Sequence, residues 1–257
     1  MPSAKINGID LYYEVHGDGP PLLLSHGVGS NHLHWWQQIP LLSRKFQVIT
    51  FDHRGFGFSG DDGRGPDEFV ADMAGLLDHL KLDKVAIAGQ SMGGITSAGF
   101  ATQHPKRVSA LILSCSGGGI VPVRHAPSMK GALEESANYL EFSSRSLEQD
   151  GFRQREPYLY FLFESMAQLN HAVNLKLLPR MRNIKSDAAP IAAAGIPVLL
   201  IGGEDDNGAN EALRGLNALL PGSQLHIIPD AGHLLFFERA QAYNALVDSF
   251  LSNTLLR

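Results

Sequence analysis

The chain has 257 residues, enough for one domain with a sizeable buried core. Hydrophobic residues make up 44% of it and charged residues 18%, within the range of globular proteins. The formal net charge of −5 argues against binding to nucleic acid or to an anionic membrane, since either needs a basic patch. No apolar stretch is long enough to span a bilayer, and residues 1–10 lack the apolar block of a secretory signal, so we expect a cytoplasmic protein.

Short apolar runs alternate with helix-like segments, a pattern typical of the α/β class: a mostly parallel central sheet with helices on both faces. Several runs are continuously apolar, as expected for strands buried on both faces. The predicted strands are residues 9–15, 22–25, 47–52, 85–89, 108–114, 197–202 and 224–228. The predicted helices of the same body are residues 66–80, 92–104, 210–220 and 239–251.

The alternation stops at three consecutive glycines, residues 117–119, and resumes at Ile196. Helix-like stretches lie between them, roughly at residues 128–142 and 157–169. A structureless connection of this length would be unusual inside a compact domain. We therefore predict an α/β core formed by residues 1–119 and 191–257, with residues 120–190 inserted as a helical cap. This cap segment is expected to shape specificity and to contribute little to the chemical step.

Residues 89–93, Gly-Gln-Ser-Met-Gly, fit the pattern G-x-S-x-G. They follow an apolar run and open a predicted helix, which is the context that gives the pattern meaning. A sharp strand-to-helix turn would hold Ser91 in a strained conformation with its hydroxyl exposed. Glycines two residues to either side avoid a collision in that turn. The motif predicts Ser91 as a nucleophile.

A serine hydroxyl is a poor nucleophile until a neighbouring base removes its proton. We predict His233 as that base, because it lies in a short glycine-containing loop after the strand at 224–228. An acid must orient the imidazole, and the loop after the strand at 197–202 offers Asp205 and Asp206. Adjacent side chains on an extended segment point in opposite directions, so only one of the two can face the imidazole.

Four further segments resemble the α/β-hydrolase superfamily, and the resemblance covers almost the whole chain. His-Gly-Val-Gly at 26–29 is similar to the family's oxyanion loop, and Asp-His-Arg-Gly-Phe-Gly-Phe-Ser at 52–59 to its D-x-R-G-x-G-x-S segment. Gly-Glu-Asp-Asp at 203–206 and Ala-Gly-His at 231–233 resemble the segments that carry the acid and the histidine. The order Ser, Asp, His is also that of the superfamily.

In the family the acid is usually the third residue after the glycine, which favours Asp206, although Asn-Gly-Ala at 207–209 departs from the usual apolar residue and proline. The resemblance also implies an oxyanion hole made by the backbone N–H groups of Val28 and Met92. For substrate binding we consider Trp35, Tyr158 and Phe161, although an aromatic residue at a helix start, such as Trp35, more often belongs to the core. Four cap arginines are alternatives for gripping a substrate carboxylate, namely Arg124, Arg145, Arg153 and Arg155.

The first interpretation is a serine hydrolase that cleaves a carboxylic ester through an acyl-enzyme. The alternatives are a C–C bond hydrolase of ring-fission diketones, an enol-lactone hydrolase and, from another class, a ligand receptor on the same fold that turns over slowly or not at all. We expect a moderately apolar small molecule as partner, no cofactor and no metal site, with Cys115 a buried apolar residue. Apolar cap surface leaves a homodimer open.

Overall fold

The computed structural model describes residues 2–123, 136, 141 and 151–256. Their strands form one sheet of eight in the order β1-β2-β4-β3-β5-β6-β7-β8. The pairs β1·β2 and β2·β4 are antiparallel, and the other neighbours are parallel. The strands are β1 (Ser3–Ile6), β2 (Ile9–His16), β3 (Pro21–Ser25), β4 (Gln47–Phe51), β5 (Val85–Gln90), β6 (Val108–Ser114), β7 (Val198–Gly203) and β8 (Gln224–Ile228).

Alternate residues of the central strands enter two separate hydrophobic clusters, one on each face of the sheet. In β5, for example, Ala86 and Ala88 lie in one cluster, and Val85 and Ile87 in the other. This is the period of two that a strand imposes on its side chains. Every residue of β5 and β7 is buried. The sequence therefore shows no alternation of polar and apolar residues there, because both faces are covered.

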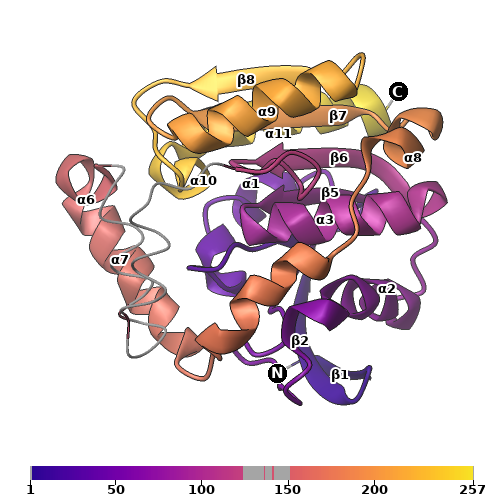
Figure 1. The fold of residues 1–257 in the computed structure, drawn as a ribbon, viewed down its shortest axis with the longest axis vertical. Coiled ribbons are helices and arrows are strands. Elements are labelled where there is room, and N and C mark those ends of the chain that lie inside the picture. Colours follow the sequence, from indigo (N-terminus) through magenta and orange to yellow (C-terminus); the bar gives the residue numbers. More distant parts are fainter. Residues whose placement is uncertain (1, 124–135, 137–140, 142–150, 257) are drawn as a thin grey trace.

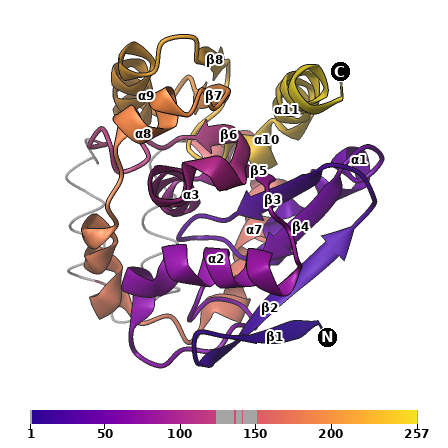
Figure 2. The same cartoon turned by 90° about the vertical axis from the view of Figure 1, so that its right-hand side faces the viewer.

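The helices divide between the two faces of this sheet (Figure 2). Residues of α2 (Phe69–His79), α3 (Met92–Gln103), α8 (Ala188–Ala193) and α9 (Asn207–Leu219) belong to one cluster. Residues of α1 (Ile39–Leu42), α10 (Leu235–Glu238) and α11 (Ala240–Leu255) belong to the other. Short 3₁₀ turns connect them at η1 (His32–Trp35), η2 (Gly65–Glu68) and η3 (Pro105–Arg107).

Within the cap segment, α6 (Phe152–Arg155) and α7 (Pro157–Ala167) lie beside the carboxyl ends of the parallel strands (Figure 1). They are followed by η4 (Gln168–Asn170) and η5 (Leu175–Asn183). Phe152, Tyr160 and Phe163 are buried in the same cluster as α10 and α11. The segment thus adds its apolar side chains to one of the two cores.

Every predicted strand is present, and the mixed α/β architecture is confirmed. The structure adds β1, a four-residue edge strand whose short alternating pattern gave too little signal. It also starts α9 at Asn207 instead of 210, and extends α11 to Leu255. The predicted helix at 157–169 appears as α7 with η4. The predicted helix at 128–142 lies outside the described residues except at positions 136 and 141.

Candidate active site

Ser91 occupies a sharp turn between β5, which ends at Gln90, and α3, which begins at Met92. Its φ is +52°, a left-handed conformation that costs a non-glycine residue about 1–3 kcal/mol. The surrounding chain holds it there: Ser91 N donates to Ser114 O at 2.9 Å, and Ser116 Oγ donates to Ser91 O at 2.8 Å. The predicted strained elbow is therefore present.

Close approach of backbone to backbone explains the glycines around this elbow. A Cβ added at Gly93 would lie 2.0 Å from Ser25 O, and one at Gly89 would lie 2.4 Å from Gly93 O. A Cβ at Gly27 would meet Gln90 Oε1 at 2.0 Å and Ser91 Cβ at 3.2 Å. The loop after β3 thus packs directly against the elbow, which brings residues 26–29 beside Ser91.

The imidazole of His233 lies between Ser91 and Asp206. His233 Nε2 is 2.9 Å from Ser91 Oγ, and His233 Nδ1 is 2.6 Å from Asp206 Oδ2. A carboxylate only accepts hydrogen bonds, so Nδ1–H is the donor to Asp206. In the neutral imidazole Nε2 is then free of a proton and can accept the hydrogen bond of the serine hydroxyl. Ser91, Asp206 and His233 follow β5, β7 and β8 respectively, so all three lie at the carboxyl edge of the sheet.

Asp206 uses its two oxygens for two different tasks. Oδ1 accepts from Ala209 N at 3.3 Å and so caps the N-terminus of α9, while Oδ2 faces His233. Burial by itself would raise the pKa of this carboxyl. The charge of His233 and hydrogen bonds from His233, Cys115 and Ala209 N outweigh burial, and they lower the pKa below its ordinary value. The carboxylate is therefore ionised at neutral pH.

Asp205 points away from the imidazole. Its Oδ2 accepts from Arg155 Nη1 at 2.8 Å, and 46% of its side chain is exposed. The unusual Asn-Gly-Ala at 207–209 forms the first turn of α9, which starts directly after Asp206. Of the two neighbouring acids, only Asp206 is brought to His233.

Three side chains that sequence reasoning did not assign to the site hold the loop of His233. Gln90 Nε2 donates to His233 O at 3.1 Å, and Glu238 Oε2 accepts from Gly232 N at 2.9 Å. Cys115 Sγ lies 3.9 Å from Gly232 O. Gln90 occupies a variable position of G-x-S-x-G and gave no signal. Glu238, an acid at the end of the apolar run 234–237, was a usable signal.

The predicted oxyanion loop is fixed from behind by buried histidines. His26 Nδ1 lies 2.8 Å from Gly27 O, and His53 N donates to His26 Nε2 at 2.9 Å. Burial lowers the pKa of His26 to about 4, so the ring is neutral at physiological pH. His26 therefore shapes the loop that carries Val28. Met92, the other predicted donor, is the first residue of α3, where backbone N–H groups have no intrahelical acceptor.

The three predicted substrate-binding side chains differ widely in exposure. Trp35 is fully buried, with its ring 4.6 Å from that of Phe236, so it belongs to one of the hydrophobic cores. Tyr158 and Phe161 are 90% and 73% exposed. The reason is that α7 has apolar side chains on more than one face, and only the stripe that includes Tyr160 and Phe163 packs on the core.

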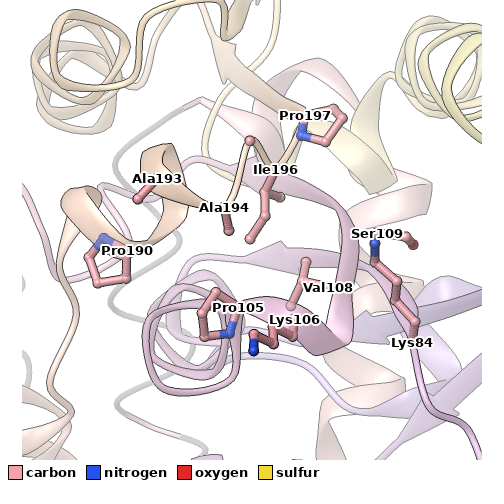
Figure 3. Close-up of a pocket in the computed structure, with 11 residues that line it drawn as sticks. Lys84, Pro105, Lys106, Val108, Ser109, Pro190, Ala193, Ala194, Ile196 and Pro197 are labelled. Carbon is pink, nitrogen blue, oxygen red and sulfur yellow. The ribbon is translucent and has the colours of Figure 1, made fainter.

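A hollow of about 520 Å³ lies at the opposite edge of the sheet (Figure 3). Its lining includes Lys84, Val108, Ser109, Ile196 and Pro197, close to where β5, β6 and β7 begin. Ligands of open α/β sheets bind at the carboxyl ends of the strands, where Ser91, Asp206 and His233 lie. We therefore assign no role in the candidate site to this hollow.

Among the described residues, Cys115, Asp206 and His233 offer ligand atoms that all lie within 4.8 Å of one another. Thiolate, carboxylate and imidazole are the ligands that Zn²⁺ takes. Here, however, Asp206 Oδ2 and His233 Nδ1 already bond each other at 2.6 Å. We interpret the group as a hydrogen-bonded cluster behind the imidazole.

The fold and the placement of these loops define a class, and comparison with known proteins agrees. The profile of the family described as alpha/beta hydrolase fold matches residues 20–139 and 121–240. The chain belongs to the α/β-hydrolase family. In the part of the chain that the structure describes, no helix is long and apolar enough to cross a bilayer.

Three individual proteins are similar over nearly the whole chain. The 2-hydroxy-6-oxo-2,4-heptadienoate hydrolase of Pseudomonas putida is 31% identical over 264 residues, covering 95% of this chain and 94% of that protein. The enol-lactonase from Burkholderia xenovorans LB400 superposes with a TM-score of 0.79 at 26% identity, over 98% of this chain and 100% of its own. A thermophilic esterase from Thermogutta terrifontis superposes with a TM-score of 0.81 at 26% identity, over 98% of this chain and 97% of that one.

Proposed function

We propose that the chain is a serine hydrolase that cleaves a carboxylic ester through an acyl-enzyme, with Ser91 as nucleophile, His233 as base and Asp206 as acid. The observation that carries this proposal is the continuous pair of contacts from Ser91 Oγ to His233 Nε2 at 2.9 Å and from His233 Nδ1 to Asp206 Oδ2 at 2.6 Å. These are hydrogen-bond distances for a nucleophile, its base and the group that orients the base.

In the proposed reaction, Ser91 Oγ attacks the ester carbonyl carbon while its proton passes to His233 Nε2. The backbone N–H groups of Val28 and Met92 stabilise the oxyanion of the tetrahedral intermediate. His233 then gives the proton to the leaving alkoxide oxygen, the C–O bond breaks, and the acyl group stays on Ser91. Water attacks this acyl-enzyme, again losing a proton to Nε2, and the acid is released as Ser91 recovers its proton.

The same groups support a second candidate, hydrolysis of a C–C bond in a ring-fission diketone. The observation in its favour is the 31% identity, over 95% of this chain, with the heptadienoate hydrolase. An enol-lactone is a cyclic ester, so its hydrolysis would follow the first scheme with an enol as leaving group. The structural similarity to the enol-lactonase supports this reaction as a third candidate. Fold and site residues are common to all three reactions.

The test compares kcat/KM on short p-nitrophenyl esters, lactones and a ring-fission dione. We expect ester hydrolysis to dominate, and Ser91→Ala to lower kcat by roughly 10³-fold or more in a folded protein. A fluorophosphonate should label the wild type at Ser91. Labelling elsewhere, or full activity of the Ala variant, would refute the assignment, and a preference for the dione would select the second candidate.

A receptor on the same fold is the rival from another class. It would be stabilised strongly by its ligand while turning over at a very low rate, whereas a hydrolase turns over its best ester or lactone rapidly. The proposed substrate is a moderately apolar small molecule, and we propose that residues 120–190 act as a cap that shapes its site. No cofactor enters the proposed chemistry. A homodimer formed through cap surface stays a prediction, as does the cytoplasmic location.

A further inference from the structure

Two consecutive charged residues at the end of α6 reach from the cap segment to the core. Arg155 Nε donates to Glu238 Oε1 at 2.6 Å, and Arg155 Nη1 donates to Asp205 Oδ2 at 2.8 Å. The next residue, Glu156, accepts from Arg239 Nη1 at 2.7 Å. The charges are therefore in opposite order on the two segments, Arg-Glu against Glu-Arg. This reciprocal pairing fixes the register in which the cap segment meets the end of α10.

Asp205 and Glu238, both bonded to Arg155, act on the two loops that carry the candidate acid and base. Asp205 lies in the loop after β7, and Glu238, the last residue of α10, contacts the loop after β8. Asp205 directly precedes the acid in the chain. Glu238 uses its second oxygen, Oε2, to accept from Gly232 N at 2.9 Å, and Gly232 directly precedes His233. One guanidinium thus contacts the loop after β7 directly at Asp205, and it reaches the loop after β8 through Glu238, which holds Gly232 N.

The contacts of Arg155 with Glu238 and with Asp205 differ in strength because they differ in burial. The Glu238 side chain has 0% exposure, against 25% for Arg155 and 46% for Asp205. A buried carboxylate that loses its cation is left as an uncompensated charge, so the contact between Arg155 and Glu238 is the strong one. The contact with Asp205 is screened by solvent and contributes less.

We infer that Arg155 is a positioning residue of the proposed triad, and that it keeps His233 and Asp206 at hydrogen-bond distance through Glu238 and Asp205. This inference rests on the proposed function. It departs from the sequence-based expectation that the cap segment contributes little to the chemical step. A displacement of about 1 Å at the reacting groups is enough to cost roughly 10²-fold in rate, so a small shift of the two loops would be measurable.

The experiment compares three variants of the full chain with wild type, assayed with p-nitrophenyl acetate. Arg155→Met keeps the aliphatic stem and removes the charge, and we expect kcat to fall about tenfold or more with KM within about twofold. Arg155→Lys keeps the charge but loses the fork that bonds both partners, so we expect a smaller loss, about threefold. Glu156→Gln is the matched control, because it breaks the neighbouring ion pair between the same two segments and should leave kcat unchanged.

The rate at which a small fluorophosphonate labels Ser91 provides a second readout, since it reports activation of the nucleophile without needing an acyl pocket. It should fall in Arg155→Met by the same factor as kcat. A change in KM alone, or equal effects of Arg155→Met and Glu156→Gln, would overturn the inference and leave Arg155 as a docking contact.

Circular dichroism and thermal unfolding establish that each variant is folded. If Arg155→Met does not fold, the test passes to Arg155→Lys and to Asp205→Asn, which changes a half-exposed side chain. A kcat and a labelling rate equal to those of wild type in both variants would then overturn the inference. If the fluorophosphonate does not label Ser91 of the wild-type protein, that result would instead refute the proposed triad. Labelling of wild type and Arg155→Met at the same rate would refute only the positioning role.

Discussion

The strands at the centre of the sheet and helix α7 are both rich in apolar residues, yet their side chains are buried to different extents. Every side chain of β5 and β7 is buried, because helices cover both faces of the sheet. On α7 only one stripe is buried, and Tyr158 on another stripe is 90% exposed. An apolar run therefore indicates that a segment is packed against the core. The neighbouring elements determine whether one face or both faces of it are buried. Positions on the central strands should be sensitive to change, and positions on α7 only on one face.

The largest effect is expected at the carboxyl edge of the sheet, where Asp205 and Asp206 are adjacent. Asp206→Asn should lower kcat by up to ~10⁴-fold, because an amide allows the wrong imidazole tautomer of His233. Asp205→Asn should stay within a few fold, since Asp205 faces Arg155 and solvent. Steady-state kinetics on folded protein measures both. The reverse pattern would move the acid to Asp205, and two mild effects would place it elsewhere.

The next effect separates the two faces of α7. Phe163 is fully buried and Phe161 is 73% exposed. Phe163→Ala should reduce the free energy of unfolding by about 3–5 kcal/mol, because it removes a large side chain from a packed core. Phe161→Ala should change it by no more than about 0.5 kcal/mol. Urea denaturation of the two variants provides the comparison. Similar losses from both would mean that α7 is covered on both sides in solution.

A third prediction concerns acid and the buried histidines His26, His34 and His53. Burial lowers their pKa values, to about 4 for His26, to about 3 for His34 and well below the usual value for His53. Between about pH 6.5 and 4 the unfolded chain takes up protons that the folded chain does not, so stability falls as pH falls. In this range each histidine adds at most about 1.4 kcal/mol per pH unit to the slope of the unfolding free energy against pH, or at most roughly 4 for the three.

Chemical denaturation at pH 7, 6 and 5 measures this slope. His34, whose Nε2 lies 3.1 Å from Phe163 O, links the η1 turn to α7, so His34→Gln should flatten the slope by about a third. His226 on β8 is exposed, and His226→Gln serves as the control that leaves the slope unchanged. A slope that is the same in all three proteins would show that His34 takes up a proton in the folded state as readily as in the unfolded chain.

Local patterns predicted much of the architecture and the order of the site residues. The apolar strands, the Gly-x-Ser-x-Gly elbow and the loops after β7 and β8 are each encoded within a few residues, and parallel strands bring such loops to one edge. The choice of Asp206 over Asp205 depended on the family pattern and on opposite side-chain directions.

Features set by distant contacts could not be predicted. Which stripe of α7 is buried depends on the position of α10, and nothing near Tyr158 in the sequence specifies it. Trp35 lies in the core because Phe236, two hundred residues later, packs against its ring. The pairing of Arg155 with Glu238 joins residues 83 positions apart. Isolated charges in a sequence do not reveal their partners.

The double use of the Asp206 carboxylate has a consequence for how this chain can evolve. Catalytic residues are often kept at a cost in stability, so that losing them makes a protein more robust. Asp206 also caps α9 through Ala209 N, and loss of such a cap costs about 1 kcal/mol. Asparagine is as good a cap as aspartate but a poor triad acid. A descendant released from selection for activity would therefore drift at position 206 toward asparagine or serine before alanine.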